Sequence, residues 1–193
     1  MRKIPTLFQR DYSVTPPKIT QEVNPECSWV LQGLGEATEK IDGTCCLYKG
    51  GFLYKRYNRK AGRTPKDGWV PAQDEPDEMG NWPGWILVDF KSSSDKWHLD
   101  ALAYYVAAGV ALDDGTYELV GPKINGNPYS MVRHELWLHG ADKLPSCPRD
   151  FANLRSWLAQ VPIEGVVWHH EDGRMAKIKR KDFDLEWPKK RGG

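Results

Sequence analysis

The stretch that decides the fold class is GVVWHHEDGRMAKIKR, residues 165–180. Two strand-like runs flank the Asp-Gly pair at 172–173, and such a pair between two runs predicts a tight β-hairpin turn. On the returning run Lys177 and Lys179 are two residues apart, so both ammonium groups point to the same side of the strand. The apolar residues beside them point to the other side. The stretch therefore predicts an antiparallel sheet with one polar and one buried face.

A second hairpin is predicted around the Lys-Gly-Gly turn at 49–51, because strand-prone residues occupy 44–48 before it and 52–57 after it. Hairpins of this kind pair strands that are close in the sequence, which is typical of antiparallel sheets. The other expected segments are an extended arm or short strands over 1–26, a long loop over 58–85, and short strands over 86–90 and 116–120.

Two helices complete the expected elements. Residues 92–95 supply N-cap chemistry for a helix over 96–108, which Gly109 ends. The second helix is predicted over 149–160, with Pro148 near its first turn. The fold class is therefore α+β, with more strands than helices. The apolar residues at helical spacing are expected to be the buried faces: Leu99, Leu102, Ala103 and Val106 on the first helix, and Phe151, Leu154 and Leu158 on the second.

Composition excludes several classes of protein. Apolar residues make up 40% of the 193 residues and charged residues 27%, which favours a soluble globular chain. No apolar run approaches the roughly 18 residues of a membrane span, and the N-terminal residues do not predict a secretory signal. The four cysteines lack the spacing of a zinc knuckle, and we interpret them as reduced thiols of a cytoplasmic protein. A membrane protein, a fibrous repeat and a disulfide-stapled mini-protein are excluded.

Charge is unevenly distributed although the net charge is only +1. Residues 49–66 carry seven basic residues and no acid, residues 67–78 carry five acids and no base, and residues 174–191 are again mostly basic. If the two basic stretches share a face, they form a footprint for nucleic-acid phosphates. The alternative interpretation is two solvated strands that are rich in Lys and Arg.

Four features in chain order carry candidate chemistry. Lys40 stands in a Lys-Ile-Asp-Gly segment, and Glu118 and Glu164 lie in or beside predicted strands. A lysine that attacks an electrophile must be neutral, and neighbouring cations such as Lys177 and Lys179 lower a lysine pKa. They could also hold a phosphate, and Glu164 could hold Mg²⁺, which prefers oxygen ligands. These are the parts of a metal-assisted lysine attack on a nucleotide phosphate.

The order of these features resembles that of the covalent nucleotidyltransferases, in the form found in ATP-dependent RNA ligases that lack an OB domain. The resemblance covers about residues 36–183, between an arm at 1–26 and a basic tail at 184–193, and implies a single nucleotidyltransferase (adenylation) domain over 1–193. The matching segments are TEKIDGT at 38–44 for motif I, Glu118 for motif III, GPKINGNPY at 121–129 for a run typical of RNA ligases, EGVV at 164–167 for motif IV and KIK at 177–179 for motif V.

The resemblance implies a three-step reaction in RNA repair. Lys40 would attack ATP and form a lysyl-AMP, the AMP would pass to a 5′-phosphate of RNA, and a 3′-hydroxyl would displace it. It also implies that Lys177 and Lys179 contact the α-phosphate and that Glu164 binds Mg²⁺ or Mn²⁺. The remaining implied contacts to the nucleotide or substrate come from Glu118 at the ribose, Glu39 beside the adenine, either Arg56 or Arg59, with a slight preference for Arg59 on spacing, and Trp137 as a stacking residue or as an ordinary core Trp.

Several alternatives stay open. Only fourteen residues follow Lys179, which is too short for an OB domain and argues against a capping enzyme and an ordinary DNA ligase. A minimal DNA ligase and a catalytically silent nucleic-acid-binding module are the competing functions. No membrane and no obligate protein partner is expected. The candidates for a pyrophosphate contact are Lys123, Arg2, Lys3 and Arg10, and we interpret His134, His139, His169 and His170 as ordinary surface or core histidines.

Overall fold

The computed structural model describes residues 1–187, so most of the expected basic tail at 184–193 lies outside the described residues. The chain folds into two compact units. Unit 1 comprises Met1–Lys3 and Asp42–His139, and unit 2 comprises Ile4–Ile41 and the described residues from Gly140 onward. The expectation of a single domain over 1–193 stays a prediction. Both units combine antiparallel strands with α-helices, one in unit 1 and two in the described part of unit 2, as the α+β class predicts.

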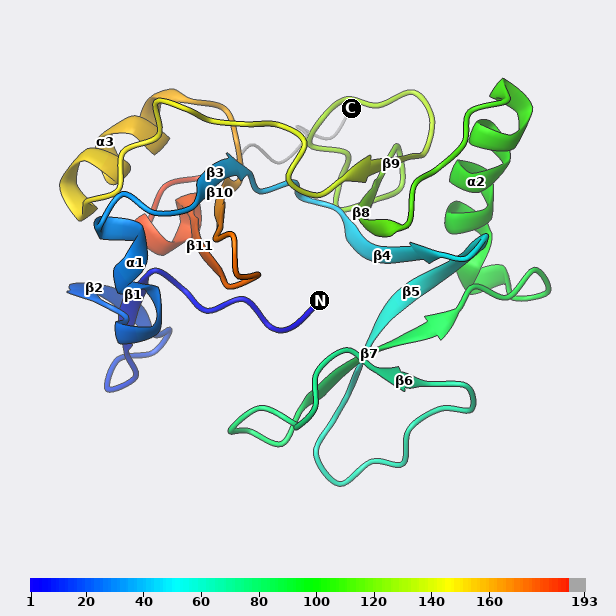
Figure 1. The fold of residues 1–193 in the computed structure, drawn as a ribbon, viewed down its shortest axis with the longest axis horizontal. Helices are drawn as coiled ribbons and strands as arrows, with labels where there is room; N and C mark the ends of the chain where they lie inside the picture. The colour runs from blue at the N-terminus through cyan, green and yellow to red at the C-terminus, as the bar shows by residue number, and fades with distance from the viewer. Residues whose placement is uncertain (188–193) are drawn as a thin grey trace. The chain divides into compact units, whose positions relative to one another are not determined.

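Unit 1 is built on a six-stranded sheet with the order β6-β7-β5-β4-β8-β9, in which every neighbouring pair is antiparallel (Figure 1). The helix α2 (Lys96–Ala108) packs against it, ends at Gly109 with a positive φ, and follows a short 3₁₀ turn at 93–95. The strands are β4 (Thr44–Lys49), β5 (Phe52–Arg59), β6 (Val70–Pro71), β7 (Trp82–Leu87), β8 (Gly115–Val120) and β9 (Glu135–Leu138).

One face of this sheet forms the core of unit 1. Alternation along the strands sends Cys46 and Tyr117 into that core, where they are buried, while Cys45 and Glu118 point to the opposite face. The buried members of the core are Cys46, Leu53, Val88, Ala101, Tyr117, Leu119, Ile124 and Leu136. The second face, which carries Cys45 and Glu118, holds the part of the candidate site that belongs to unit 1.

Unit 2 is built on a three-stranded antiparallel sheet with the order β11-β10-β3 and on the hairpin β1-β2 (Figure 1). The segment before β1 extends the sheet, because backbone hydrogen bonds join residues 5–7 to Lys177. The elements are β1 (Phe8–Asp11), β2 (Lys18–Val23), a 3₁₀ turn (Pro25–Cys27), α1 (Ser28–Leu31), β3 (Glu36–Glu39), α3 (Phe151–Gln160), β10 (Gly165–His169), β11 (Met175–Lys179) and a 3₁₀ turn (Arg180–Phe183).

The core of unit 2 lies against the apolar face of β10 and β11. Ala176 and Ile178 are fully buried there, so the predicted two-sided pattern of the hairpin is confirmed. Leu154 and Leu158 of α3 are also fully buried, as predicted, and the carboxylate of Asp150 caps the helix by accepting from the Asn153 backbone N–H. The helix begins at Phe151, two residues later than expected.

Three expectations about unit 1 were wrong in whole or in part. The strand predicted over 86–90 runs earlier, as β7, because its pairing with β5 begins at Trp82 and leaves Phe90 79% exposed. On α2 the bounds are confirmed and the buried face is right in part: Leu99 and Leu102 pack against the core as predicted, but Ala103 and Val106 are exposed and Ala101 is buried instead. Asp95 does not cap α2 through its side chain, because that buried carboxylate pairs with Lys55. Local propensity determines where α2 begins and ends, but tertiary packing determines which of its faces is buried.

None of the described helices is both long and apolar enough to cross a bilayer.

Candidate active site

The chemistry-bearing residues of unit 2 gather at one end of its sheet. Lys40 follows β3, Glu164 precedes β10, and Lys179 ends β11. The two oxygens of the Glu164 carboxylate are divided between the amines: Oε2 lies 2.6 Å from Lys40 Nζ and Oε1 lies 2.8 Å from Lys179 Nζ. Glu164 is buried and both lysines are mostly covered. We call Lys40, Glu164, Lys177 and Lys179 the lysine cluster.

Strand pairing brings these residues together. The backbone N–H of Lys40 donates to the carbonyl of Gly165 at 2.9 Å, which fixes Lys40 beside the start of β10. Gly165 pairs with Lys179, and a Cβ at Gly165 would overlap the carbonyl of Ile178. Only glycine permits this approach, which keeps the neighbouring Glu164 carboxylate within reach of both lysines. The Glu-Gly pair of the EGVV segment is thus a geometric requirement.

Lys177 lies on the same face of β11 as Lys179 but has no carboxylate partner among the described residues. Burial first, and then the charges of Lys179 and Lys40, lower the pKa of Lys177 to about 8. Three lysines against one carboxylate leave two uncompensated positive charges in the cluster when all are protonated. A partly buried group of cations of this kind is suited to an anion with several oxygens, such as a phosphate.

Unit 1 presents its candidate residues as a row across the second face of its sheet. Cys45 of β4 pairs with Glu118 of β8, and Glu118 pairs with Trp137 of β9. Continuing the β4–β5 register places Arg56 beside Cys45, and Arg56 pairs with Trp85 of β7. The guanidinium lies 5.1 Å from the centroid of the Trp85 ring. We call these five residues the sheet row.

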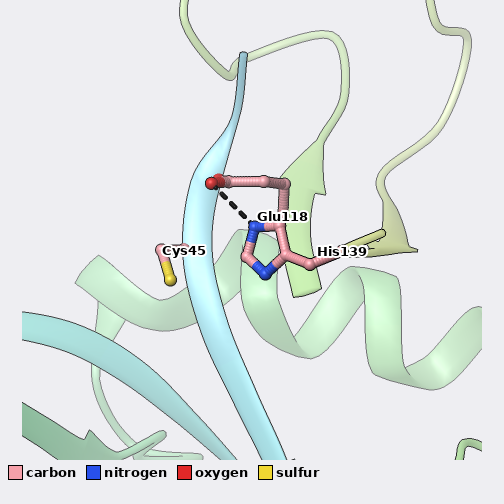
Figure 2. Close-up of side chains that lie close together, drawn as sticks. All are labelled: Cys45, Glu118 and His139. Atoms are coloured by element: carbon pink, nitrogen blue, oxygen red, sulfur yellow. Dashed lines mark hydrogen bonds and ion pairs between the residues drawn. The ribbon is translucent and has the colours of Figure 1, made fainter. Parts of the chain in front are cut away.

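Glu118 is held in the sheet row by a histidine (Figure 2). His139 Nε2 lies 3.1 Å from Glu118 Oε1, and His139 Nδ1 lies 2.9 Å from Thr116 Oγ1. The second carboxylate oxygen, Oε2, is buried and has no hydrogen-bond partner among the described residues. A buried carboxylate oxygen without a partner is costly. Glu118 is therefore presented as an acceptor.

The two arginines that sequence reasoning could not separate occupy different surroundings. Arg56 donates to the Met1 carbonyl at 2.6 Å and to Asn58 Oδ1 at 3.2 Å. Burial lowers its pKa, and the neighbouring Cys45 and Glu118 oppose that shift. Arg59 instead stacks against tryptophans, with its guanidinium 5.0 Å from the Trp82 ring centroid. The structure thus favours Arg56 as the arginine associated with Glu118.

The other expected contacts are placed as follows. Trp137 is half-buried beside Glu118, and its ring lies 4.8 Å from that of Tyr129. Glu39 ends β3 opposite Val166 in unit 2. Among the pyrophosphate candidates, Arg10 is already paired with Asp182, Lys3 with Asp77 and Arg2 with Asp74.

The segment at 121–129 supports motif I within unit 1. Asn125 Nδ2 donates to Asp42 Oδ1 and to the Gly43 carbonyl, both at 2.9 Å, and the Tyr129 hydroxyl accepts from the Asp42 backbone N–H at 2.7 Å. A Cβ at Gly43 would overlap the Leu119 carbonyl and crowd Glu118. These contacts give a physical reason for the co-occurrence of the two motifs: one loop holds the start of β4 against β8.

Sequence reasoning missed His139, Cys45 and Asn125 as parts of the site. His139 was interpreted as an ordinary histidine because β9 was not recognised, and no local pattern shows that residue 139 lies opposite Thr116. Cys45 was weighed only for zinc-knuckle spacing within the chain. Asn125 lay inside a quoted motif, but its hydrogen bonds depend on the fold. Only strand pairing connects these residues to Glu118.

Comparison with known proteins identifies relatives of this chain. The family model for RNA ligase 1 matches residues 110–192. RNA ligase 1 of Rattus norvegicus is 31% identical, in an alignment that covers 97% of this chain and 82% of the rat protein. RNA ligase 1 of Danio rerio is 28% identical with the same coverage, and that of Pongo abelii is 30% identical over 78% of this chain and 68% of its own length.

Proposed function

This chain belongs to the RNA ligase 1 family, a family of enzymes, and on that premise we propose that it is an ATP-dependent ligase that joins 5′-phosphate and 3′-hydroxyl ends of RNA. The reaction passes through a lysyl-AMP and an adenylylated RNA. We place the activity in RNA repair in the cytoplasm and assign the chain the adenylation-domain fold of nucleotidyltransferases. The lysine cluster is the observation that carries this proposal.

Lys40 is the proposed nucleophile. Its Nζ attacks the α-phosphorus of ATP, an N–P bond forms, and the bond to the pyrophosphate oxygen breaks as pyrophosphate leaves. The amine must lose a proton before it attacks. Glu164 Oε2, at 2.6 Å, holds the Lys40 amine in one position and is close enough to accept that proton. Fixing the amine also lowers the entropic cost of the attack.

Lys177 and Lys179 are the proposed contacts to the α-phosphate. Both project from one face of β11 beside Lys40, and the charge developing on the phosphate oxygens in the transition state lies next to two cations. Lys177 forms no ion pair with a carboxylate among the described residues, although Glu164 and Asp182 are near enough to affect its pKa, so its charge is available to a phosphate. A bound phosphate would offset the cost of holding this cation in a covered site.

The motif resemblance assigns Mg²⁺ or Mn²⁺ to Glu164, whose two oxygens contact Lys40 and Lys179 in this structure. Mg²⁺ is held in many nucleotide sites by one or two carboxylates together with phosphate oxygens and water. Glu164 is the carboxylate of the lysine cluster, and it would hold the ion directly or through water once a nucleotide supplies the remaining oxygens. When bound, the ion would neutralise charge on the phosphates.

Three residues of the sheet row and Glu39 of unit 2 supply the remaining proposed roles. Glu118, with one carboxylate oxygen unpartnered among the described residues, accepts a hydrogen bond from a ribose hydroxyl. Arg56 rather than Arg59 acts near the ribose or substrate phosphate. Trp137 stacks on the base, and Glu39 in unit 2 lies beside the adenine. These four roles come from the motif resemblance, and the geometry within each unit is compatible with them.

Label transfer from α-labelled ATP to the protein in the presence of Mg²⁺ tests the first step. Wild type should become labelled, and Lys40→Ala should not. The matched control is Lys143→Ala, which removes an exposed lysine of unit 2 that pairs with Glu36 and should leave labelling unchanged. Equal labelling of the Lys40→Ala variant would contradict the proposal.

A second arm offers the labelled protein RNA and DNA nicks of the same sequence, each with a 5′-phosphate and a 3′-hydroxyl. Sealing of RNA supports the proposed function. Sealing of DNA together with failure on every RNA end would establish a DNA ligase instead. Binding of RNA with no protein labelling from ATP, GTP or NAD would establish a catalytically silent binding module.

A further inference from the structure

Cys45 completes a set of three metal-type donors on the sheet row. Cys45 Sγ, a carboxylate oxygen of Glu118 and a ring nitrogen of His139 all lie within 4.8 Å of one another, and each side chain is part-buried or buried (Figure 2). The donors come from β4, β8 and the residue after β9, so backbone pairing holds them. None of the four cysteines, all of which are described, forms a disulfide.

The histidine is oriented as a metal ligand would be. Its Nδ1 lies 2.9 Å from the Thr116 hydroxyl, which can either donate or accept. If Nδ1–H donates to Thr116, the lone pair of Nε2 points toward Glu118 and is available to an ion. Metal-ligating histidines commonly use the second ring nitrogen in this way, because the outer hydrogen bond fixes the ring and its tautomer.

The Glu118 carboxylate has one oxygen that could still accept a ligand. Glu118 Oε2 is buried without a hydrogen-bond partner among the described residues, although Oε1 faces His139. The 3.1 Å between Nε2 and Oε1 is close to the edge of a tetrahedron of ligands around a small ion, roughly 3.3 Å for bonds of about 2.0 Å. A small cation could therefore be shared by Nε2 and Oε1 at close to their present separation.

We propose that Cys45, Glu118 and His139 form a binding site for a thiophilic divalent cation, with Zn²⁺ as the best-suited ion. Thiolate, imidazole and carboxylate are the usual zinc donors, and three protein ligands leave a fourth position open to water. The mixed sulfur and nitrogen donors disfavour Mg²⁺, which selects oxygen. The site is thus chemically distinct from the all-oxygen metal position assigned to Glu164.

Charge balance supports the choice of a divalent ion. A thiolate and a carboxylate together neutralise Zn²⁺. The neighbouring Arg56 adds one positive charge, which opposes cation binding, so both anionic ligands are needed to hold the ion. Hydrogen bonds to the Met1 carbonyl and Asn58 hold the guanidinium of Arg56 in place.

Occupancy of the site would act on the enzyme through Glu118. This consequence rests on the proposed function, in which Glu118 accepts a ribose hydroxyl. A carboxylate bound to Zn²⁺ is a weaker hydrogen-bond acceptor for the ribose hydroxyl, so Zn²⁺ and ATP should compete for the protein. The site would then lower ligase activity when a thiophilic metal is available and restore it when the metal is removed.

Co²⁺ alone tests the site without any need for activity. The full chain is purified with a non-thiol reductant, freed of metal with a chelator and titrated with Co²⁺, and the near-ultraviolet thiolate-to-cobalt absorption band is recorded. Wild type should bind one equivalent with that band, and Zn²⁺ should displace it. Cys45→Ser should abolish the band, and His139→Gln should weaken binding by more than about tenfold.

The matched thiol control is Cys147→Ser, which removes a half-buried cysteine of unit 2 and should leave the band unchanged. Circular dichroism establishes that each variant is folded. Absence of the band in wild type, or its persistence in Cys45→Ser, would overturn the site. Metal binding that leaves the label transfer from ATP unaffected would overturn only the competition, and metal binding by a chain with no label transfer would separate this site from the proposed function.

Discussion

The lysine cluster of unit 2 and the sheet row of unit 1 each contain one mostly buried glutamate, and the two carboxylates are treated in opposite ways. Glu164 has a lysine amine on each oxygen, whereas Glu118 has a histidine on one oxygen and no partner among the described residues on the other. The first carboxylate holds groups that are already in the protein. The second is presented for a group that is not. The difference suggests that Glu164 positions a nucleophile and Glu118 recognises a ligand.

The largest effect is expected from removing the charge of Glu164. Glu164→Gln keeps the shape but removes the charge that fixes two amines, so Lys40 loses its position and the rate of label transfer from saturating ATP should fall by about 100-fold or more. Single-turnover labelling measures this rate. Glu36→Gln, which removes an exposed partner of Lys143 in the same unit, is the control. A normal rate in Glu164→Gln would remove Glu164 from the proposed chemistry.

Removing the charge of Glu118 should change mainly the KM for ATP rather than the rate at saturating ATP. In Glu118→Gln the hydrogen-bond acceptor for the ribose is weakened. The KM for ATP should rise by about tenfold, which corresponds to the loss of one hydrogen bond to a charged group. The rate at saturating ATP should fall by a smaller factor. Labelling over a range of ATP concentrations separates the two constants. A fall in rate with no change in KM would make Glu118 resemble Glu164 and would end the contrast.

A smaller effect is expected where motif I meets the loop at 121–129. Asn125→Gly removes two hydrogen bonds to Asp42 and Gly43 while keeping a backbone that tolerates its positive φ. The free energy of unfolding should drop by about 1 kcal/mol, because these bonds are exposed. Urea denaturation measures the change. Ser130→Gly, at another positive-φ position of this region, corrects for the added flexibility of glycine, and an equal loss in both variants would contradict the bracing role of Asn125.

The last effect concerns how the stability of the chain depends on pH through unit 2. Burial lowers the pKa of Lys177 to about 8 in the folded chain, below its usual 10.5. The unfolded chain therefore holds this proton more tightly, and the contribution of Lys177 to stability should rise as pH increases from about 8 to about 10.5. In Lys177→Met the free energy of unfolding should no longer rise over this pH range. A lysine in an ion pair, whose pKa is raised, would instead lose stability as the pH increases. Urea denaturation at several pH values measures the free energy of unfolding of wild type and of Lys177→Met. The same pH dependence in both proteins would show that burial does not lower the pKa of Lys177.

Local patterns predicted a large part of each unit. The β10–β11 hairpin follows from its Asp-Gly turn and from the alternation of lysines with Ala176 and Ile178, and α2 has the expected bounds because a glycine stop follows a helical run. These features depend on interactions between residues that are near in the sequence. The buried face of α2 was predicted correctly only for Leu99 and Leu102, because the strands that cover the helix, β5 and β9, are distant from it in the sequence.

The sequence by itself determined the chemistry of the lysine cluster: the residue types, their spacing on β11 and the glycine that lets Glu164 approach the neighbouring strand. Only the tertiary structure decided that Cys45, Glu118 and His139 lie together and that Arg56, not Arg59, stands beside them. The physical reason is strand register. Which residues face each other across β4, β5, β8 and β9 depends on long-range hydrogen-bonded pairing, which no local pattern of residues specifies.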